Sequence, residues 1–428
     1  MILVRPLRST ALYRFALYLR SFLTIKTFTA FCCLAYLIFI FKTRPKVILT
    51  EEDLIQQVIR NVAKDSRYSY MYRKKENLSK DVKYILLWTP KDVPPLYFYE
   101  EGEKAFIKNN CLYVNCFVTD DKYFLDSITK FDVIAFNGYE LNKLRNSLPP
   151  ERTPNQRYIY FNLESADNHP VCNTTFDNFF NWTATYRLDS DIVTPYIQIK
   201  NLDGDKVGPK IDMQWQISEN FKDYDLNVRW RSKTKAVAWF VSHCKIRSNR
   251  TKVAEALQEA MLPYGMKLYI FGKCGSYKCP NYLVKDCYKM LKEEFFFYLA
   301  FENSFSEDYV TEKLLTAMLH DAVPIVLGGA NYSRFLPPGS YLDASSHTPE
   351  ELAATMHAVI HSSTLFQSYF NWRDHYVYYN PQKGPYRSSV CDLCTALNDK
   401  AKMDTTKVYD DFRGWWNPDY KTRCKEVP

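Results

Sequence analysis

The sequence has 428 residues, which is enough for about two domains of ordinary size. Hydrophobic residues make up 46% of the chain and charged residues 24%, a composition that is typical of globular proteins and excludes disorder along the whole chain. The formal net charge of +8 is spread without a dense basic run, which argues against nucleic acid as a partner and leaves a small anion open as a ligand.

The first predicted element is a membrane anchor. Residues 27–41 read TFTAFCCLAYLIFIF, and extension back to Ser21 makes the run long enough to span a bilayer if Lys26 reaches the headgroups. A cleaved signal peptide is the alternative, but no small-residue cleavage site follows the run. Basic residues are more numerous before the run than after it, which places the N-terminus in the cytosol. We therefore predict a single-pass type II protein with a cytoplasmic tail (1–20), a transmembrane signal-anchor (21–41) and a stem (42–80).

Cysteines and glycosylation motifs agree with a lumenal location for the rest of the chain. Of twelve cysteines, Cys32 and Cys33 lie inside the predicted anchor, which leaves an even number for disulfide bonds. Motifs for N-glycosylation begin at five asparagines, of which Asn181 and Asn249 lie in segments that are assigned to the functional site below. The remaining candidates for glycosylation are Asn77, Asn173 and Asn331.

From residue 83 onward, short apolar runs alternate with connections of helix or loop length. The first predicted strands are 83–88, 111–118, 131–136 and 157–164. A polar stretch at 200–235 then separates two halves of the chain. In the second half we predict strands at 236–241, 267–272, 295–302 and 323–328, and helices at 250–262, at 285–294 and from Glu312 onward.

Short buried strands joined by helices indicate parallel sheets that are covered on both faces. Two such halves predict an α/β protein with two facing Rossmann-like domains and a cleft between them. We expect the N-terminal domain at 81–225, the C-terminal domain at 226–395 and a C-terminal extension at 396–428.

Two strand-to-helix junctions of the second half carry cations. A helix N-terminus has roughly half a positive charge, so Lys313 at the start of a helix is unexpected unless an anion binds there. Arg247 and Arg250 occupy the corresponding junction after strand 236–241. Solvated surface charge explains either junction alone, but both junctions meet at the same edge of a parallel sheet. We therefore predict that they bind one anion, a diphosphate.

The segment around Lys313 also carries a resemblance. FENSFSEDYVTEKLLTAMLHDAVPIVLGG (301–329) closely resembles the hallmark motif of the α1,3-fucosyltransferases, glycosyltransferase family 10. The resemblance extends in order over about residues 83–395 and includes FNLES (161–165), FNWTATYRLDSDIVTPY (180–196), WFVSHC (239–244), YGMKLYIFGKCG (264–275) and CDLC (391–394).

The resemblance implies donor-binding roles for four residues of the hallmark motif. Lys313 would contact the diphosphate, and Glu312 would accept hydrogen bonds from sugar or ribose hydroxyls. Asn303 and Tyr309 fall on further donor-binding positions of the motif.

Two more roles follow from segments outside that motif. Arg250 matches an arginine that holds phosphate in the family, but its loop is one residue longer here, so Arg247 competes for the role. Glu164 matches the position proposed as the general base. Ala166 stands where the family often has proline, so the local turn is expected to differ, and Asp167 is the nearest alternative base.

For the whole protein, the resemblance implies a GT-B fold, an inverting mechanism and GDP-β-L-fucose as donor, in a type II Golgi membrane protein. No cofactor is required for the chemistry, although stimulation by a divalent cation such as manganese is compatible with it. The acceptors would be N-glycans of glycoproteins. The longer loop before Arg250 and the C-terminal piece favour transfer to the innermost Asn-linked GlcNAc, and the alternative acceptor is outer N-acetyllactosamine or LacdiNAc.

Two other functions stay open at this point. A metal-dependent GT-A transferase would hold manganese with an Asp-x-Asp motif, and such motifs occur at 189–191, 203–205 and 223–225. In the family that we identify, the first of these is not a metal site, and we predict no metal site. A membrane protein that binds glycans or nucleotides without turnover would use the same donor-binding residues but would not need Glu164.

Cys391 and Cys394 form a Cys-x-x-Cys motif, for which a redox pair or half of a zinc site are alternatives. The resemblance implies that this pair is a structural disulfide. Cys274 and Cys279 are candidates for another short disulfide loop.

Overall fold

The computed structural model describes residues 81–141, 144, 147–218, 223–244, 246–382 and 388–426. The predicted cytoplasmic tail, anchor and stem, together with Asn77, lie outside the described residues. Within the described residues, no helix has the length and apolar character needed to cross a bilayer.

A six-stranded parallel sheet forms the first half of the described chain. Its strands have the order β2-β1-β3-β4-β5-β6, and nearly all of their side chains are buried because both faces are covered. The prediction of a strand at 111–118 was wrong in its first part: pairing with β1 begins only at Cys116, and Leu112 is 84% exposed. The strands are β1 (Lys83–Leu87), β2 (Cys116–Thr119), β3 (Val133–Asn137), β4 (Arg157–Asn162), β5 (Trp182–Thr185) and β6 (Ile192–Val193), and the short helix α4 (Lys104–Lys108) precedes β2.

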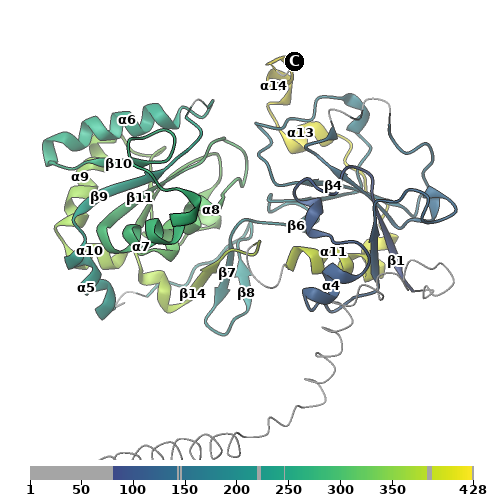
Figure 1. Ribbon diagram of the computed structural model, residues 1–428, viewed down its shortest axis with the longest axis horizontal. Helices are drawn as coiled ribbons and strands as arrows, with labels where there is room; N and C mark the ends of the chain where they lie inside the picture. Colours follow the sequence, from purple (N-terminus) through teal and green to yellow (C-terminus); the bar gives the residue numbers. More distant parts are fainter. Residues whose placement is uncertain are drawn as a thin grey trace, which may run out of the picture. The chain divides into compact units, whose positions relative to one another are not determined.

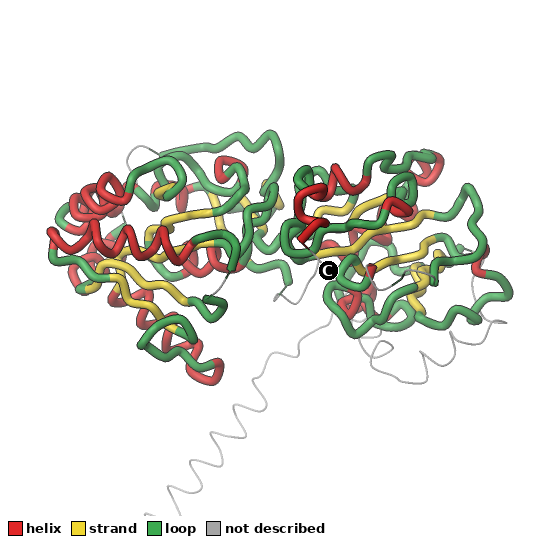
Figure 2. The backbone as a smooth tube through the Cα atoms, turned by 90° about the horizontal axis from the view of Figure 1, so that it is seen from above, coloured by secondary structure: helices red, strands yellow, loops and turns green. Residues whose placement is uncertain are grey.

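The second half contains a five-stranded parallel sheet in the order β10-β9-β11-β12-β13, with helices around it (Figures 1 and 2). The predicted strands and helices of this half agree with the structure to within about two residues at each end, and the predicted α/β class with parallel sheets is confirmed. The strands are β9 (Lys235–Phe240), β10 (Leu268–Phe271), β11 (Phe295–Phe301), β12 (Val323–Leu327) and β13 (Leu342–Asp343). The helices are α5 (Tyr224–Ser232), α6 (Arg250–Met261), α7 (Val284–Glu294), α8 (Glu312–Leu319), α9 (Pro349–Ile360) and α10 (Ser363–Ser368).

A small antiparallel sheet links segments from before and after the second sheet. The hairpin of β7 (Gln198–Asn201) and β8 (Lys206–Gly208) lies in the stretch that the sequence marked as polar, and β14 (Tyr376–Tyr379) pairs with β7. The chain thus returns toward the first half after completing the second sheet.

The C-terminal helices pack on the first sheet. Val390 and Leu393 of α11 (Ser388–Asn398) belong to the same apolar core as β1 and β3, and α11 lies beside α4 (Figure 1). The sequence-based division, which assigned residues up to 395 to the C-terminal domain, is corrected here, because the apolar face of α11 is buried against the first sheet. The helices that follow are α12 (Lys400–Asp404), α13 (Phe412–Trp416) and α14 (Tyr420–Glu426).

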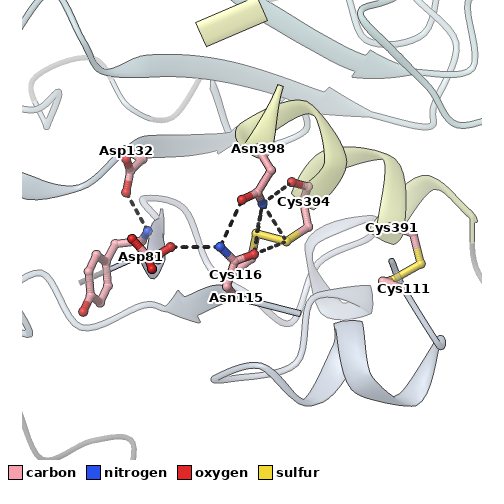
Figure 3. The surroundings of a disulfide bond; sticks show 9 residues. Asp81, Cys111, Asn115, Cys116, Asp132, Cys391, Cys394 and Asn398 are labelled. Carbon is pink, nitrogen blue, oxygen red and sulfur yellow. Dashed lines mark hydrogen bonds between the residues drawn. A yellow bond between two sulfur atoms is a disulfide. The ribbon is translucent and has the colours of Figure 1, made fainter. Parts of the chain in front are cut away.

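The cysteine pairing differs from both predictions made from the sequence. Cys391 and Cys394 do not pair with each other: they lie one turn apart on α11, so both face the same neighbours and bond to Cys111 and Cys116 (Figure 3). All ten cysteines beyond the predicted anchor are disulfide-bonded.

Cys274 does not pair with Cys279 either. Cys244 and Cys274 follow the neighbouring parallel strands β9 and β10, whose carboxyl ends lie side by side, and these two cysteines are bonded. Cys279 pairs with Cys287 on α7, and Cys172 pairs with Cys424 on α14.

Candidate active site

One pocket lies where parallel sheets of this kind bind ligands. In the second sheet, β9 is flanked by β10 on one side and β11 on the other, so the connections that follow β9 and β10 run in opposite directions along the sheet. A pocket of about 420 Å³ opens beyond the carboxyl ends of β9 and β11. Six of the seven residues predicted for catalysis and donor binding line it: Glu164, Arg250, Asn303, Tyr309, Glu312 and Lys313.

Lys313 at the start of α8 has a partner that the sequence did not reveal. Its Nζ lies 3.0 Å from Oε2 of Glu302 and 3.5 Å from Oε1 of Glu312, and it donates a hydrogen bond to Thr311 Oγ1. Burial disfavours the charged amine, but the carboxylates of Glu302 and Glu312 outweigh this effect and hold the pKa of Lys313 above its ordinary value. Lys313 is therefore a charged side chain in the pocket wall and not a solvated surface lysine.

Glu302 holds the start of α8 as well as the lysine. Its carboxylate is 1% exposed and accepts hydrogen bonds from the backbone N–H and the hydroxyl of Thr311, at 2.8 and 2.9 Å. Thr311 is the residue before α8, so Glu302 satisfies a donor that the helix leaves unpaired. One buried carboxylate thereby fixes both the helix N-terminus and the position of Lys313.

Arg250, the first residue of α6, lies in the part of the wall that follows β9. It donates to the carbonyl oxygens of Phe301 (2.9 Å) and His243 (3.0 Å), and only 3% of the residue is exposed. Burial lowers the pKa of Arg250 from its ordinary value, while Glu302 opposes the shift. Arg247 is exposed and does not line the pocket.

Two polar atoms of the pocket-lining residues lack partners within the part of the chain that the structure describes. They are the Nε donor of Arg250 and the Oδ1 acceptor of Asn303, and both are buried. Most buried polar atoms in proteins are hydrogen-bonded, so an unpaired donor and acceptor in residues of one pocket indicate a ligand with both kinds of group. A nucleotide with phosphates and hydroxyls has this character.

Tyr309 joins the first pocket to the other half of the chain. It is 3% exposed and packs edge-on against Tyr186 and Tyr196, with ring centroids 4.9 and 6.1 Å away. Burial raises the pKa of Tyr309 well above its ordinary value, so its hydroxyl stays protonated at neutral pH.

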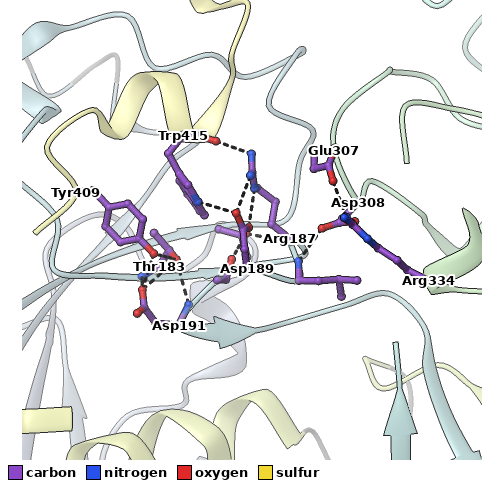
Figure 4. A network of polar contacts seen from close by, with 12 residues as sticks. Thr183, Arg187, Asp189, Asp191, Glu307, Asp308, Arg334, Tyr409 and Trp415 are labelled. Carbon is purple, nitrogen blue, oxygen red and sulfur yellow. Dashed lines mark hydrogen bonds and ion pairs between the residues drawn. The ribbon is translucent and has the colours of Figure 1, made fainter. Parts of the chain in front are cut away.

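Asp308, the residue before Tyr309, has a left-handed backbone conformation with φ of 56°. Its carboxylate accepts a hydrogen bond from the backbone N–H of Leu188 (3.0 Å) and pairs with Arg334 (2.8 Å), as Figure 4 shows. These contacts fix the loop before α8 against the segment between β5 and β6.

A second pocket, of about 480 Å³, meets the first at Glu164 and Tyr196, which line both. Its walls come from the segments after β1, β3 and β4, which is the corresponding edge of the first sheet. Tyr97 and Tyr139 line this pocket and are each about half exposed. Glu164 is exposed, and its backbone N–H donates to Oδ1 of Asn162 at 2.8 Å.

Sequence reasoning missed several residues of the first pocket, among them Tyr196, His243, Tyr288 and Tyr298. Tyr196 and His243 both lie in segments that were matched by resemblance, so the sequence held a signal for these two residues. Tyr288 and Tyr298 carry no local pattern that separates them from core aromatics.

The Asp-x-Asp motifs lie elsewhere, since none of their aspartates lines either pocket. Asp189 pairs with Arg187 (2.8 Å), and Asp191 accepts hydrogen bonds from Thr183 and Tyr409 (Figure 4). Among the other motifs, Asp205 closes the β7–β8 turn with Asn201, Asp223 caps α5, and Asp225 lies near Arg229.

The predicted glycosylation sites within the described residues lie on short turns. Asn173 is half-buried beside the Cys172–Cys424 disulfide, and Asn331 is exposed. Asn181, which the sequence analysis set aside, is buried and accepts a hydrogen bond from the backbone N–H of Tyr158.

Comparison with known sequences places both halves in one family. Residues 230–415 match the family described as "Glycosyltransferase family 10 (fucosyltransferase) C-term", and residues 80–197 match "Fucosyltransferase, N-terminal".

Individual proteins with fucosyltransferase names are also similar to this chain. The chain is 37% identical over 310 residues to the alpha-(1,3)-fucosyltransferase C of Drosophila melanogaster, covering 72% of this chain and 70% of that protein. It is 30% identical to the glycoprotein 3-alpha-L-fucosyltransferase A of the same organism (74% and 57% covered). It is 32% identical to a human 4-galactosyl-N-acetylglucosaminide 3-alpha-L-fucosyltransferase (64% and 67% covered). A solved structure of an alpha1,3-fucosyltransferase with GDP-fucose aligns with a TM-score of 0.44 at 14% identity, over 77% of this chain and 92% of that one.

Proposed function

Because this chain belongs to glycosyltransferase family 10 and is an α1,3-fucosyltransferase, we propose that its first pocket binds GDP-β-L-fucose and its second pocket an N-glycan. Fucose would pass from one to the other with inversion at its anomeric carbon. The observation that carries this proposal is that Glu164 lines both pockets, so one carboxylate lies between the expected donor and the expected acceptor.

On the donor side, the leaving group is a diphosphate that gains negative charge as its bond to fucose breaks. Lys313, Arg250 and the backbone N–H groups at the N-terminus of α8 surround the pocket in which it would lie. Cations and helix dipoles held rigidly in place stabilise such charge without reorganisation during the reaction. The buried carboxylate of Glu302 keeps Lys313 in position before the donor arrives.

On the acceptor side, a base must take the proton from the attacking hydroxyl. Glu164 is exposed at the junction of the pockets and can reach a hydroxyl in the second one. One base and one stabilised leaving group suffice for a single displacement, which inverts the anomeric carbon. Asn303, Tyr309 and Glu312 line the donor pocket and would orient the nucleotide sugar.

For the acceptor, we propose the innermost Asn-linked GlcNAc of glycoprotein N-glycans, with α1,3 linkage to its O3. The longer loop before Arg250 and the C-terminal segment beyond α11 support this choice. Tyr97 and Tyr139 offer aromatic surface in the second pocket, against which a sugar ring can pack. One relative is named as a glycoprotein 3-alpha-L-fucosyltransferase and another for a 4-galactosyl-N-acetylglucosaminide, so the names of the relatives do not single out one acceptor.

The cellular setting is part of the same proposal: a single-pass type II protein of the Golgi membrane with its catalytic part in the lumen. The support is that all ten cysteines of the described chain are disulfide-bonded, as expected in an oxidising compartment. No metal is assigned a role in the reaction, since Lys313 and Arg250 supply the positive charge at the leaving group.

The acceptor proposal is tested by supplying GDP-fucose with a trimmed N-glycopeptide and free N-acetyllactosamine in one reaction. We expect mass spectrometry of the products to find fucose on the reducing-end GlcNAc of the glycopeptide core. Fucose found only on the lactosamine would contradict the core-directed proposal and leave the donor site unaffected.

A further inference from the structure

A disulfide and several hydrogen bonds connect the loop that carries Glu164 to the C-terminal segment of the chain. The loop follows β4 and runs to Cys172, which is bonded to Cys424 of α14. Asn417 donates a side-chain hydrogen bond to the carbonyl oxygen of Ala166 (3.0 Å), and the indole of Trp416 donates to that of His169 (2.9 Å). Trp416 is fully buried and Asn417 is buried, so these bonds are shielded from water.

Arg423 makes the most extensive of these contacts. Its guanidinium donates to the carbonyl oxygen of Asp167 through Nε (2.9 Å) and Nη2 (2.6 Å), and Nε also lies 2.7 Å from the carboxylate oxygen Oδ1. The arginine is 5% exposed. A planar guanidinium that contacts both the backbone and the side chain of one residue holds that residue in a single orientation.

The same loop also contacts the donor side of the site. The backbone N–H of Asp167 donates to Oγ of Ser306 (3.1 Å), in the segment that leads to Tyr309 and α8. The backbone N–H of Ala166 donates to the hydroxyl of Tyr186 (3.0 Å), whose ring packs against Tyr309. Asp167 thus lies between the C-terminal helix and the donor-binding segment, three residues after Glu164.

The disulfide between Cys172 and Cys424 alone would attach the C-terminal segment to the loop. The hydrogen bonds from Trp416, Asn417 and Arg423 are therefore additional constraints on the loop. The residues involved, from Trp416 to Cys424, lie after residue 415, at which the match to the family ends. Their contacts converge on a loop whose exposed carboxylate must be aimed at an acceptor hydroxyl.

We propose that Arg423 is a positioning residue for Glu164 and acts through Asp167. This inference rests on the proposed role of Glu164 as the base. With Arg423 in place, the backbone of the loop is fixed on both sides, and the carboxylate of Glu164 stays at the junction of the two pockets. Without it, the loop gains freedom at Asp167, and displacements of about 1 Å at a reacting group can cost up to about a hundredfold in rate.

The test is a double-mutant cycle in the full-length enzyme with Arg423→Leu and Glu164→Gln. We expect Arg423→Leu alone to lower kcat about ten- to a hundredfold while the KM for GDP-fucose changes by less than about twofold. In the Glu164→Gln background the same change should lower kcat by less than about threefold, because the group that it positions is already disabled.

The matched control is Arg413→Leu. Arg413 lies on the same C-terminal segment, pairs with Asp177 (2.8 Å) and makes a longer contact with the carbonyl oxygen of Cys172 (3.4 Å), where the disulfide to Cys424 still holds the loop. It does not contact Asp167, so its loss should affect stability without this loss of kcat. If Arg423→Leu does not yield folded protein, Trp416→Phe removes the indole bond to His169 and keeps an aromatic ring in the core, although the side chain becomes smaller. It should lower kcat in the same direction.

Three results would overturn the inference: normal kcat in Arg423→Leu or, in its place, Trp416→Phe; an equal loss in the Arg413→Leu control; or an undiminished effect in the Glu164→Gln background. Full activity of Glu164→Gln would refute the base assignment and this role with it. Normal activity of Arg423→Leu beside an impaired Glu164→Gln would refute the positioning role alone.

Discussion

Replacement of Lys313 by alanine tests the role of its charge in the reaction and its role in the fold at the same time. Lys313 Nζ lies 3.0 Å from the carboxylate of Glu302, which is 1% exposed. Removal of the lysine withdraws a cation from the leaving group and also leaves a buried carboxylate without its ion-pair partner. Both consequences follow from one substitution, so activity and stability must be measured together.

The two effects have different sizes. Loss of one preorganised group that stabilises developing charge costs about 2.7–4 kcal/mol, or a hundred- to a thousandfold in kcat. Loss of one partner of a buried ion pair costs about 3–5 kcal/mol of folding free energy, because the remaining charge is uncompensated. Thr311 still donates two hydrogen bonds to Glu302, which places the expected cost at the lower end of that range.

The double variant Glu302→Gln/Lys313→Ala resolves the ambiguity. It removes the buried charge together with the lysine, so we expect most of the lost stability to return in thermal unfolding while kcat stays at least a hundredfold below wild type. The assay is GDP release with a saturating glycopeptide acceptor. Near wild-type turnover in the double variant would refute the assignment of Lys313 to the leaving group.

The other predictions concern the base, pH and metal ions. Glu164→Gln should lower kcat by about two to four orders of magnitude with the KM for GDP-fucose unchanged, and a parallel loss of donor affinity would show that Glu164 serves the donor side. Burial raises the pKa of Glu103 to about 8, and no hydrogen-bond partner of its Oε2 is present among the described residues. The unfolded chain releases this proton near the ordinary pKa of 4.5, so stability should fall as pH rises from about 5 to 8, and Glu103→Gln should flatten this dependence in chemical denaturation. Activity should persist in excess chelator, and a complete loss that manganese reverses would contradict metal-independent catalysis.

Most of the parallel strands were predictable because their signal is local, whereas the short strands β5, β6 and β13 were not predicted. β9, β11 and β12 are continuous runs of buried apolar residues, and their length and β-branched or aromatic content identify them without knowledge of the fold. The anion-binding junctions were predictable for a related reason, since parallel strands bring the helix starts that follow them to one edge. Lys313 and Arg250 could therefore be assigned to one site before any distance was known.

Pairings between distant segments were not predictable in this way. The disulfide between Cys111 and Cys391 joins residues 280 positions apart, and the local sequence around either cysteine does not indicate which cysteine it bonds to. The ion pair between Glu302 and Lys313 was not predictable either, because it depends on the turn between β11 and α8. The same is true of the C-terminal segment, because its contacts with the Glu164 loop arise only after the chain has returned to the first sheet.

The position of bound GDP is the most direct test of the assignment of the two pockets. A crystal structure of the enzyme soaked with GDP should show diphosphate oxygens within hydrogen-bonding distance of Lys313 Nζ and the Arg250 guanidinium, with Glu164 on the side that faces the second pocket. A diphosphate bound in the second pocket, or away from both cations, would contradict the donor site described for this enzyme.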